Sequence, residues 1–236
     1  MTRALPVLLQ GDGFIAVAKP SGMLVHRNRF NPRADAALQR VRDQVGGMVY
    51  PIHRLDGATS GCLLFATDRA LAGPLSAALS AGEKRYVALV RGAARGPRSV
   101  VVDRALRDDN GIEKSAVTAL HAVAVCEDPP CSVVLAQPQT GRYHQVRRHL
   151  RGLSHPIIGD RAHGDSHINR AWRARGVGRL ALHCLSITLS LAGETLDIRC
   201  PLPADLATPM AALPLWAEAC AAIPDLSGPP LSSARP

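Results

Sequence analysis

The sequence lacks any long apolar segment. Its N-terminal run, MTRALPVLLQGDG, is too short for a membrane span or a signal peptide, and Asp12 interrupts it early. Apolar residues make up 47% of the chain and charged residues 20%, which is typical of a soluble globular protein. We therefore expect a cytoplasmic protein with a buried core and no membrane association.

Cysteine pairs at metal-binding or redox spacing are also absent. No two of the six cysteines form a CxxC motif, so the sequence predicts neither a disulfide framework nor a zinc site. Reduced, mostly buried thiols are expected instead. The cysteines are Cys62, Cys126, Cys131, Cys184, Cys200 and Cys220.

Lysine and aromatic residues are scarce. Among 28 basic residues only Lys19, Lys84 and Lys114 are lysines, and aromatic residues make up 3% of the chain. The formal charge is +9, and residues 140–180 hold nine arginines against two aspartates, while residues 25–54 hold six against two. A polyanion such as nucleic acid would bind these two segments. Genomic base-composition bias and solvated surface arginines are the alternatives.

Apolar patterns predict the secondary structure. Runs rich in β-branched residues predict strands at residues 14–19, 62–67, 86–90, 99–102, 117–125, 132–137, 180–191 and 195–200, the last two as a hairpin. Helical spacing and capping residues predict helices at 34–45, from Asp68 to about residue 80, at 143–151 and at 206–222. Because consecutive strands often lack an intervening helix, we predict an α+β fold with a mainly antiparallel sheet.

A polar segment, HRLDGATSG at residues 53–61, lies just before a predicted apolar strand. A carboxylate at Asp56 would sit on a loop held by a rigid strand, which is a common position for reactive groups. The alternative is structural, with Asp56 capping a turn formed by the Thr-Ser-Gly that follows.

A second segment, QTGRYHQVRRHL at residues 139–150, is strongly basic. On a helix opened by Thr140 and Gly141, one face would be basic and the other apolar. The basic face could bind phosphates or a carboxylate, or it could simply be solvated. The basic side chains are His144, Arg147, Arg148 and Arg151, and the core-directed ones are Val146, Leu150 and Leu153.

A third segment combines HPIIGD at residues 155–160 with HGDSH at 163–167. Histidines beside aspartates raise the possibility of a metal site, but Gly164 makes a helical His163–His167 pair doubtful. We favour a loop held by aspartate side-chain hydrogen bonds.

Five motifs in order, HRLDGATSG, KRYVALVRG, TGRYHQVRRHL, HPIIGD and RLALHC, resemble the RluA-type family of RNA pseudouridine synthases. The N-terminal GDGFIAVAKPSGMLVHR is similar to that family's opening motif, and the resemblance runs from about residue 7 to 200. LVHRN, VRDQVGG and HPIIGDRAHGDSHINR are most similar to the TruC branch, which modifies position 65 of tRNA. The chain is shorter than that branch's usual pattern between about residues 106 and 135.

The resemblance implies a fold and a domain organisation. It implies a mixed, mainly antiparallel sheet flanked by helices and split by a central RNA-binding cleft. Residues 1–223 would form the catalytic domain without an S4-type RNA-binding module, and 224–236, rich in proline, serine and glycine, would be a disordered tail.

The resemblance also implies a reaction and the residues that perform it. Uridine in RNA, most plausibly in tRNA, would be isomerised to pseudouridine with no cofactor, metal or obligate protein partner. Asp56 would be the catalytic carboxylate, Arg147 its counter-charge (Arg142 being the weaker candidate), and Tyr86 the ring that packs on the flipped uracil. The remaining implied RNA contacts are Arg54 in the space that the base vacates, Leu182 beneath the uracil, and Arg142, His144, Arg148 and Arg151.

Other readings of the sequence stay open. Within the family, ribosomal RNA is the alternative substrate. A non-catalytic RNA-binding or RNA-chaperone protein would need only the charge. A metal-dependent nuclease would need clustered carboxylates, for which Asp160 and Asp165 are the only candidates.

Overall fold

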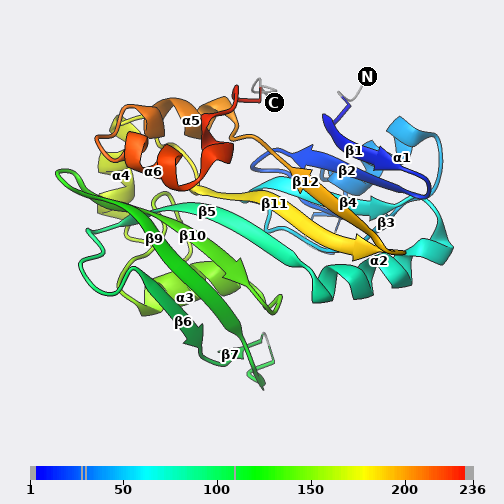
Figure 1. Cartoon of the computed structure of the whole chain (residues 1–236), viewed down its shortest axis with the longest axis horizontal. Helices are drawn as coiled ribbons and strands as arrows, with labels where there is room; N and C mark the ends of the chain where they lie inside the picture. The colour runs from blue at the N-terminus through cyan, green and yellow to red at the C-terminus, as the bar shows by residue number, and fades with distance from the viewer. Residues whose placement is uncertain (1–3, 28, 30, 109, 232–236) are drawn as a thin grey trace. The chain divides into compact units, whose positions relative to one another are not determined.

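The computed structural model describes residues 4–27, 29, 31–108 and 110–231 (Figure 1). The chain folds into two compact units. The first comprises residues 1–83 and 186–200, and the second comprises residues 84–185 and 201–236. No helix of the described part has the length and apolarity to cross a membrane.

The first unit is built on antiparallel strands whose central members are buried along their whole length. Phe14–Lys19 and Ser60–Ala66 are buried at every position and pair with each other, so their apolar runs form the core of this unit. The strands are β1 (Val7–Gly11), β2 (Phe14–Lys19), β3 (Tyr50–Pro51), β4 (Ser60–Ala66), the Ser186–Leu191 part of β11 (Leu182–Leu191), and β12 (Glu194–Arg199).

Two helices complete the first unit, α1 (Ala37–Val45) and α2 (Arg69–Ala81). The side chain of Asp68 accepts a hydrogen bond from the backbone nitrogen of Ala70 at 2.9 Å, so the predicted helix cap is confirmed. The helix continues through Pro74, anchored by buried Leu75 and Leu79. The predicted hairpin is also confirmed, with β11 and β12 joined by a two-residue turn.

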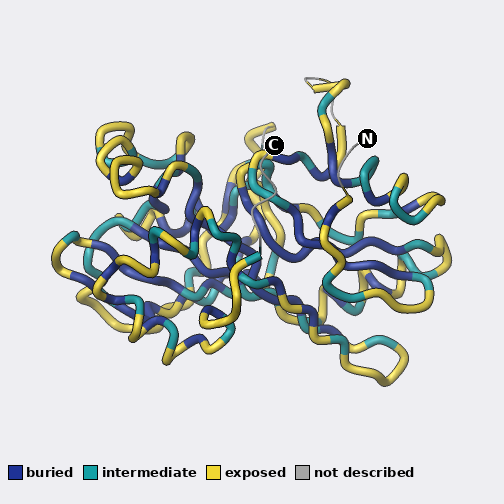
Figure 2. Tube along the Cα trace, turned by 90° about the horizontal axis from the view of Figure 1, so that it is seen from above, coloured by how far each residue is buried: buried dark blue, intermediate teal, exposed yellow. Residues whose placement is uncertain are grey.

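The second unit contains an antiparallel sheet in the order β5-β10-β9-β6. The tube in Figure 2 shows long buried stretches along the chain, which include most of β5 and β10. The pairs β1–β2, β5–β10, β9–β10 and β11–β12 are all antiparallel. The predicted α+β class with a mainly antiparallel sheet is therefore confirmed. The strands are β5 (Glu83–Arg91), β6 (Ser99–Asp103), β7 (Leu106–Arg107), β8 (Glu113–Lys114), β9 (Val117–Glu127) and β10 (Pro130–Pro138).

Helices of the second unit pack against this sheet. Helix α3 contacts both β9 and β10, and α6 contacts β9 (Figure 1). The helices are α3 (Gln145–Gly152), α4 (Ser166–Ala174), α5 (Ala204–Ala211), α6 (Trp216–Ala222) and the short 3-10 helix η1 (Pro224–Ser227).

Two sequence expectations near the C-terminus are corrected. The single helix expected at 206–222 is two helices, because Pro214 has no backbone N–H to donate and the chain turns between Ala211 and Trp216. The tail expected to be disordered begins instead with η1, in which Leu226 is buried. The last expected tail residues, 232–236, lie outside the described residues.

The six cysteines are all reduced, five of them buried and Cys220 half-buried, as predicted. Burial raises the pKa of Cys131 to about 12, so this thiol remains protonated.

Candidate functional site

The loop that carries Asp56 is fastened to the end of β2 by a buried lysine. Lys19 is 1% exposed, and its Nζ donates hydrogen bonds to the carbonyl oxygens of Pro20, Met23 and Gly57 at 3.0, 2.7 and 3.2 Å. A buried ammonium group requires such partners, because an unpaired charge in the interior is costly. The residue after Asp56 is therefore tied to the core of the first unit.

Further hydrogen bonds hold the same loop. The backbone nitrogen of Gly22 donates to the carbonyl of Gly57 at 2.8 Å, and Ser21 Oγ donates to the carbonyl of Ala58 at 2.7 Å. The backbone nitrogen of Thr59 closes a turn on the carbonyl of Asp56 at 3.0 Å. Asp56 itself is half-buried, so its carboxylate is carried on a fixed backbone.

Replacing Lys19 should loosen this loop. In Lys19→Met the three carbonyls lose their charged donor, and we expect a loss of about 2–3 kcal/mol of unfolding free energy. Denaturant unfolding measures this. Lys114→Met is the control, because Lys114 is exposed and its ion pair with Asp108 lies at the surface, so little change is expected. We call these three hydrogen bonds of Lys19 the clamp, and a Lys19→Met protein as stable as wild type would contradict its role in holding the loop.

The other residues assigned to the flipped base differ in exposure. Arg54, two residues before Asp56, is exposed. Tyr86 in β5 is 8% exposed and Leu182 at the start of β11 is 3% exposed. Their apolar surfaces are therefore shielded from water within the second unit.

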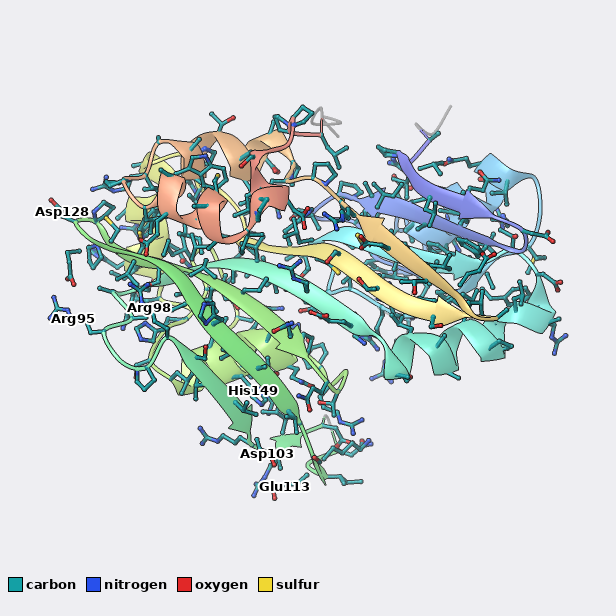
Figure 3. All side chains as sticks on the ribbon, in the orientation of Figure 1. Arg95, Arg98, Asp103, Glu113, Asp128 and His149 are labelled. Atoms are coloured by element: carbon teal, nitrogen blue, oxygen red, sulfur yellow. The ribbon has the colours of Figure 1, made fainter. Side chains whose placement is uncertain are left out.

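Helix α3 is anchored to the sheet of the second unit through a buried histidine. His149 Nδ1 lies 2.9 Å from Thr118 Oγ1, and His149 Nε2 lies 3.1 Å from the carbonyl oxygen of Arg104. His149 is labelled in Figure 3. The carbonyl can only accept, so Nε2 carries the proton and Nδ1 accepts from the threonine hydroxyl. Burial lowers the pKa of His149, which keeps the ring neutral in this arrangement.

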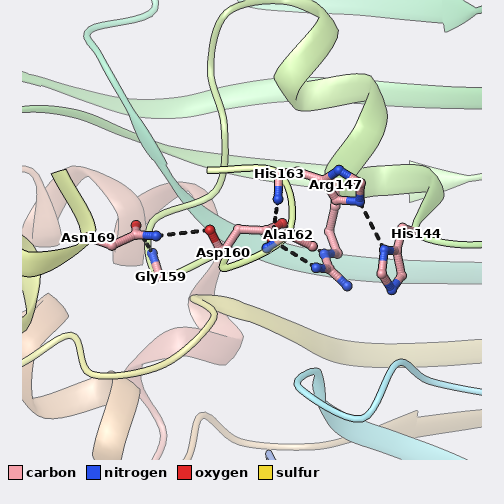
Figure 4. Close-up of polar contacts among 7 residues, drawn as sticks. All are labelled: His144, Arg147, Gly159, Asp160, Ala162, His163 and Asn169. Carbon is pink, nitrogen blue, oxygen red and sulfur yellow. Dashed lines mark hydrogen bonds and ion pairs between the residues drawn. The ribbon is translucent and has the colours of Figure 1, made fainter. Parts of the chain in front are cut away.

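Arg147 faces inward from α3 and forms a buried ion pair with Asp160. Its Nε and Nη2 each donate to one carboxylate oxygen at 2.8 Å (Figure 4). The side chains are 7% and 0% exposed. Burial alone would raise the pKa of Asp160, but the hydrogen bonds from Arg147 and from the backbone of His163 and Ala162 hold it below its usual range.

Asp160 also organises the loop that follows it. Its Oδ1 accepts hydrogen bonds from the backbone nitrogens of Ala162 and His163 at 2.9 and 3.0 Å. Asn169 of α4 donates to the Asp160 carbonyl at 2.9 Å and accepts from the backbone nitrogen of Gly159 at 2.8 Å (Figure 4). Gly159 has φ +79°, and a Cβ there would lie 1.9 Å from the carbonyl oxygen of Arg179, so only glycine fits.

The histidines and aspartates considered for metal binding have structural hydrogen bonds. Asp165 caps α4 by accepting from the backbone nitrogens of His167 and Ile168 at 2.8 and 3.0 Å. This is the loop held by aspartate side chains that the sequence favoured. Within the described ranges, no three metal-binding side chains come together.

The basic face predicted on α3 is corrected in two respects. Arg147 does not share one face with the other basic residues: it is buried and pairs with a carboxylate, which was one of the alternatives for this face, while Arg148 is half-buried and Arg151 is exposed. Leu153 lies beyond the helix and is 39% exposed, so it does not pack in the core. Val146 and Leu150 are buried as predicted.

The helix also begins two residues later than predicted, at Gln145. Thr140 does not cap it. Instead Thr140 Oγ1 donates to Gln145 Oε1 at 2.6 Å, and the backbone nitrogen of Arg142 donates to the same oxygen at 3.0 Å. His144 then takes a left-handed conformation, with φ 53°. The side chain of Gln145 therefore closes the turn that the threonine was expected to begin.

The predicted residues are divided between the two units. Arg54 and Asp56 belong to the first, while the second holds Tyr86, Arg142, His144, Arg147, Arg148, Arg151 and Leu182. The pairing of Asp56 with Arg147 stays a prediction. Sequence reasoning missed the roles of Lys19 and Gln145, and it did not pair Arg147 with Asp160. A lysine that ends an apolar strand directly before Pro-Ser-Gly was the available signal for Lys19.

Comparison with known protein families shows which family this chain belongs to. The family model described as RNA pseudouridylate synthase matches residues 13–151. This chain belongs to that family. The resemblance inferred from the motifs, and the enzyme class it implied, are confirmed.

Curated relatives are similar over most of the chain. The tRNA pseudouridine synthase C of Pasteurella multocida is 41% identical over 202 residues, covering 76% of this chain and 83% of the relative. The protein of the same name from Haemophilus ducreyi is 40% identical, covering 76% and 82%. Among solved structures, human RNA Pseudouridylate Synthase Domain Containing 4 has a TM-score of 0.72 at 24% identity, over 87% of this chain and 92% of that chain. That structure supports the fold alone.

Proposed function

We propose that this chain converts uridine to pseudouridine in tRNA, with Asp56 as the catalytic carboxylate. The supporting observation is the position of Asp56, on a loop clamped by Lys19 within a chain about 40% identical to tRNA pseudouridine synthases C. The finer assignment is uridine 65 in the T-stem, which rests on the likeness of LVHRN, VRDQVGG and HPIIGDRAHGDSHINR to the TruC branch.

The reaction breaks the N1–C1′ bond, turns the uracil within the site, and joins C5 to C1′. A sugar centre that develops positive charge favours a carboxylate beside it, as in retaining glycosidases. Asp56 fills that role whether it attacks C1′, adds to C6 of the base or removes the 2′ proton. The exchange involves no net oxidation and no group donor, so the residues of the chain suffice.

The target base must leave its helix before Asp56 can reach it. Arg54, exposed and two residues away, is suited to fill the vacated space. By the family resemblance, Tyr86 packs on the uracil and Leu182 lies beneath it, and stacking on an aromatic ring contributes about 1–3 kcal/mol. We assign Arg147 to the ionised Asp56, in addition to its pairing with Asp160.

The substrate assignment is tested with unmodified transcripts. Purified protein should form pseudouridine at one T-stem uridine of certain tRNAs, because the rest of the tRNA positions that base at the site. Carbodiimide treatment followed by primer extension locates the product. Transcripts with that uridine changed to cytidine are the control. Efficient modification of ribosomal RNA with none of tRNA would move the chain to the alternative substrate.

A further inference from the structure

An exposed aromatic ring lies directly before α3. Tyr143 is 51% exposed, and its ring is stacked on the imidazole of His144 with centroids 3.7 Å apart and planes 21° from parallel. Only 3% of the residues in this chain are aromatic, so an exposed ring supported by a second ring is an uncommon feature here. One face of the tyrosine ring is backed by the imidazole, and about half of the side chain remains accessible to solvent.

This surface is held rigidly from below. His144 Nδ1 lies 2.9 Å from His163 Nε2, and the two rings meet edge to face (Figure 4). Burial, together with Arg147, Arg151 and Arg148, lowers the pKa of His163 against the opposing effect of Asp160, so one ring nitrogen can accept this hydrogen bond. The backbone of His163 is bound in turn to Asp160, the partner of Arg147.

The neighbouring charges favour a nucleic acid. Arg142 Nε donates to the carbonyl of Ser115 at 2.9 Å, and Arg148 Nη1 donates to the carbonyl of Arg107 at 2.9 Å. Both are charged side chains held by backbone carbonyls, with Arg142 directly before Tyr143 in the chain and Arg148 in the helix that follows it. Aromatic rings combined with nearby cationic side chains are how proteins bind unstacked bases of single-stranded nucleic acid.

We propose that Tyr143 and His144 form a stacking platform for an unpaired nucleobase of the RNA substrate, a base other than the target uridine. The proposal rests on the proposed function, since flipping one base out of a helix leaves neighbouring bases without their normal stacking. The platform shares a rigid network with Arg147, so a base stacked on Tyr143 would be held in register with that residue.

Three variants test the platform. Tyr143→Leu keeps apolar bulk but removes the ring, and we expect KM for tRNA to rise about fivefold to a hundredfold with a smaller change in kcat. Tyr143→Phe keeps the ring and should stay within about twofold of wild type. Val101→Ala alters another exposed apolar residue of the second unit and is the control.

A spectroscopic readout separates stacking from packing. RNA carrying 2-aminopurine beside the target uridine should stay quenched on binding wild type and Tyr143→Phe, because the ring replaces the lost stacking, and should brighten on binding Tyr143→Leu. The proposal is overturned if Tyr143→Leu binds the RNA and affects its fluorescence as wild type does. It is also overturned if Tyr143→Phe is as defective as Tyr143→Leu, or if the only defect of Tyr143→Leu is a lowered Tm. If wild type forms no pseudouridine in any tRNA, the proposed function fails, and the binding and quenching data still decide the platform.

Discussion

Asp56→Asn should abolish pseudouridine formation while tRNA binding survives within a few-fold. Asparagine has nearly the same shape as aspartate but carries no negative charge, so the loop clamped by Lys19 should stay in place while the bond-breaking step loses its carboxylate. We expect turnover to fall by about 10²–10⁴-fold or more. Release of tritium from uridine labelled at C5 measures turnover, because C5 loses its hydrogen when it is joined to C1′.

The control for this variant is Asp43→Asn. Asp43 belongs to the same unit, is exposed and pairs with Arg42 at 2.7 Å, so its loss should leave turnover unchanged. Turnover of Asp56→Asn within tenfold of wild type would remove Asp56 from its proposed role. Loss of both turnover and binding would point to a disturbed loop, which the Lys19 variant would reproduce.

Arg147→Ala and Arg148→Ala, at adjacent positions of α3, should differ in kind. Arg148 is half-buried and bound to a backbone carbonyl, so its loss should weaken tRNA binding and lower the salt slope of log K by about one, with turnover at saturating tRNA retained. Loss of Arg147 should reduce turnover by orders of magnitude. Single-turnover rates at saturating RNA, with titrations over a range of salt, distinguish the two results.

The ion pair with Asp160 complicates Arg147→Ala, because an unpaired buried carboxylate costs about 3–5 kcal/mol. A double variant, Arg147→Met with Asp160→Asn, leaves no buried charge at these two positions. The amide oxygen can still accept hydrogen bonds from the backbone nitrogens of Ala162 and His163. We expect the double variant to regain much of the stability but none of the turnover. Recovery of turnover in the double variant would reduce Arg147 to a structural role and contradict its assignment to Asp56.

What the sequence predicted well was local. The successive apolar residues of FIAVAK predict a buried strand. Asp68 predicts a helix cap because it directly precedes a helical pattern. The motifs around Asp56 and Arg147 identified the family before any geometry was known. These signals depend on neighbours in the chain, which a single sequence contains.

What the sequence predicted poorly depended on distant partners. Helical spacing alone placed Arg147 on one basic face with Arg148 and Arg151, whereas Arg147 is buried against Asp160, 13 residues away. The start of α3 differs from the prediction because the side chain of Gln145 is held by β9, where its Nε2 donates to the carbonyl of Val117 and to Thr118 Oγ1, both at 2.9 Å. Lys19 is the clearest case, since its partner Gly57 lies 38 positions further along the chain.

The clamp at Lys19 bears on how enzymes of this kind could acquire new substrates. One ammonium group joins the backbone at residues 20, 23 and 57, so the strand end and the loop of Asp56 move as a single body. Mutations that reposition this loop to suit a different RNA would have to break a buried, fully hydrogen-bonded charge. Adaptation to another RNA is thereby directed to exposed positions such as Arg54 and Tyr143, which can change while the chemistry stays where it is.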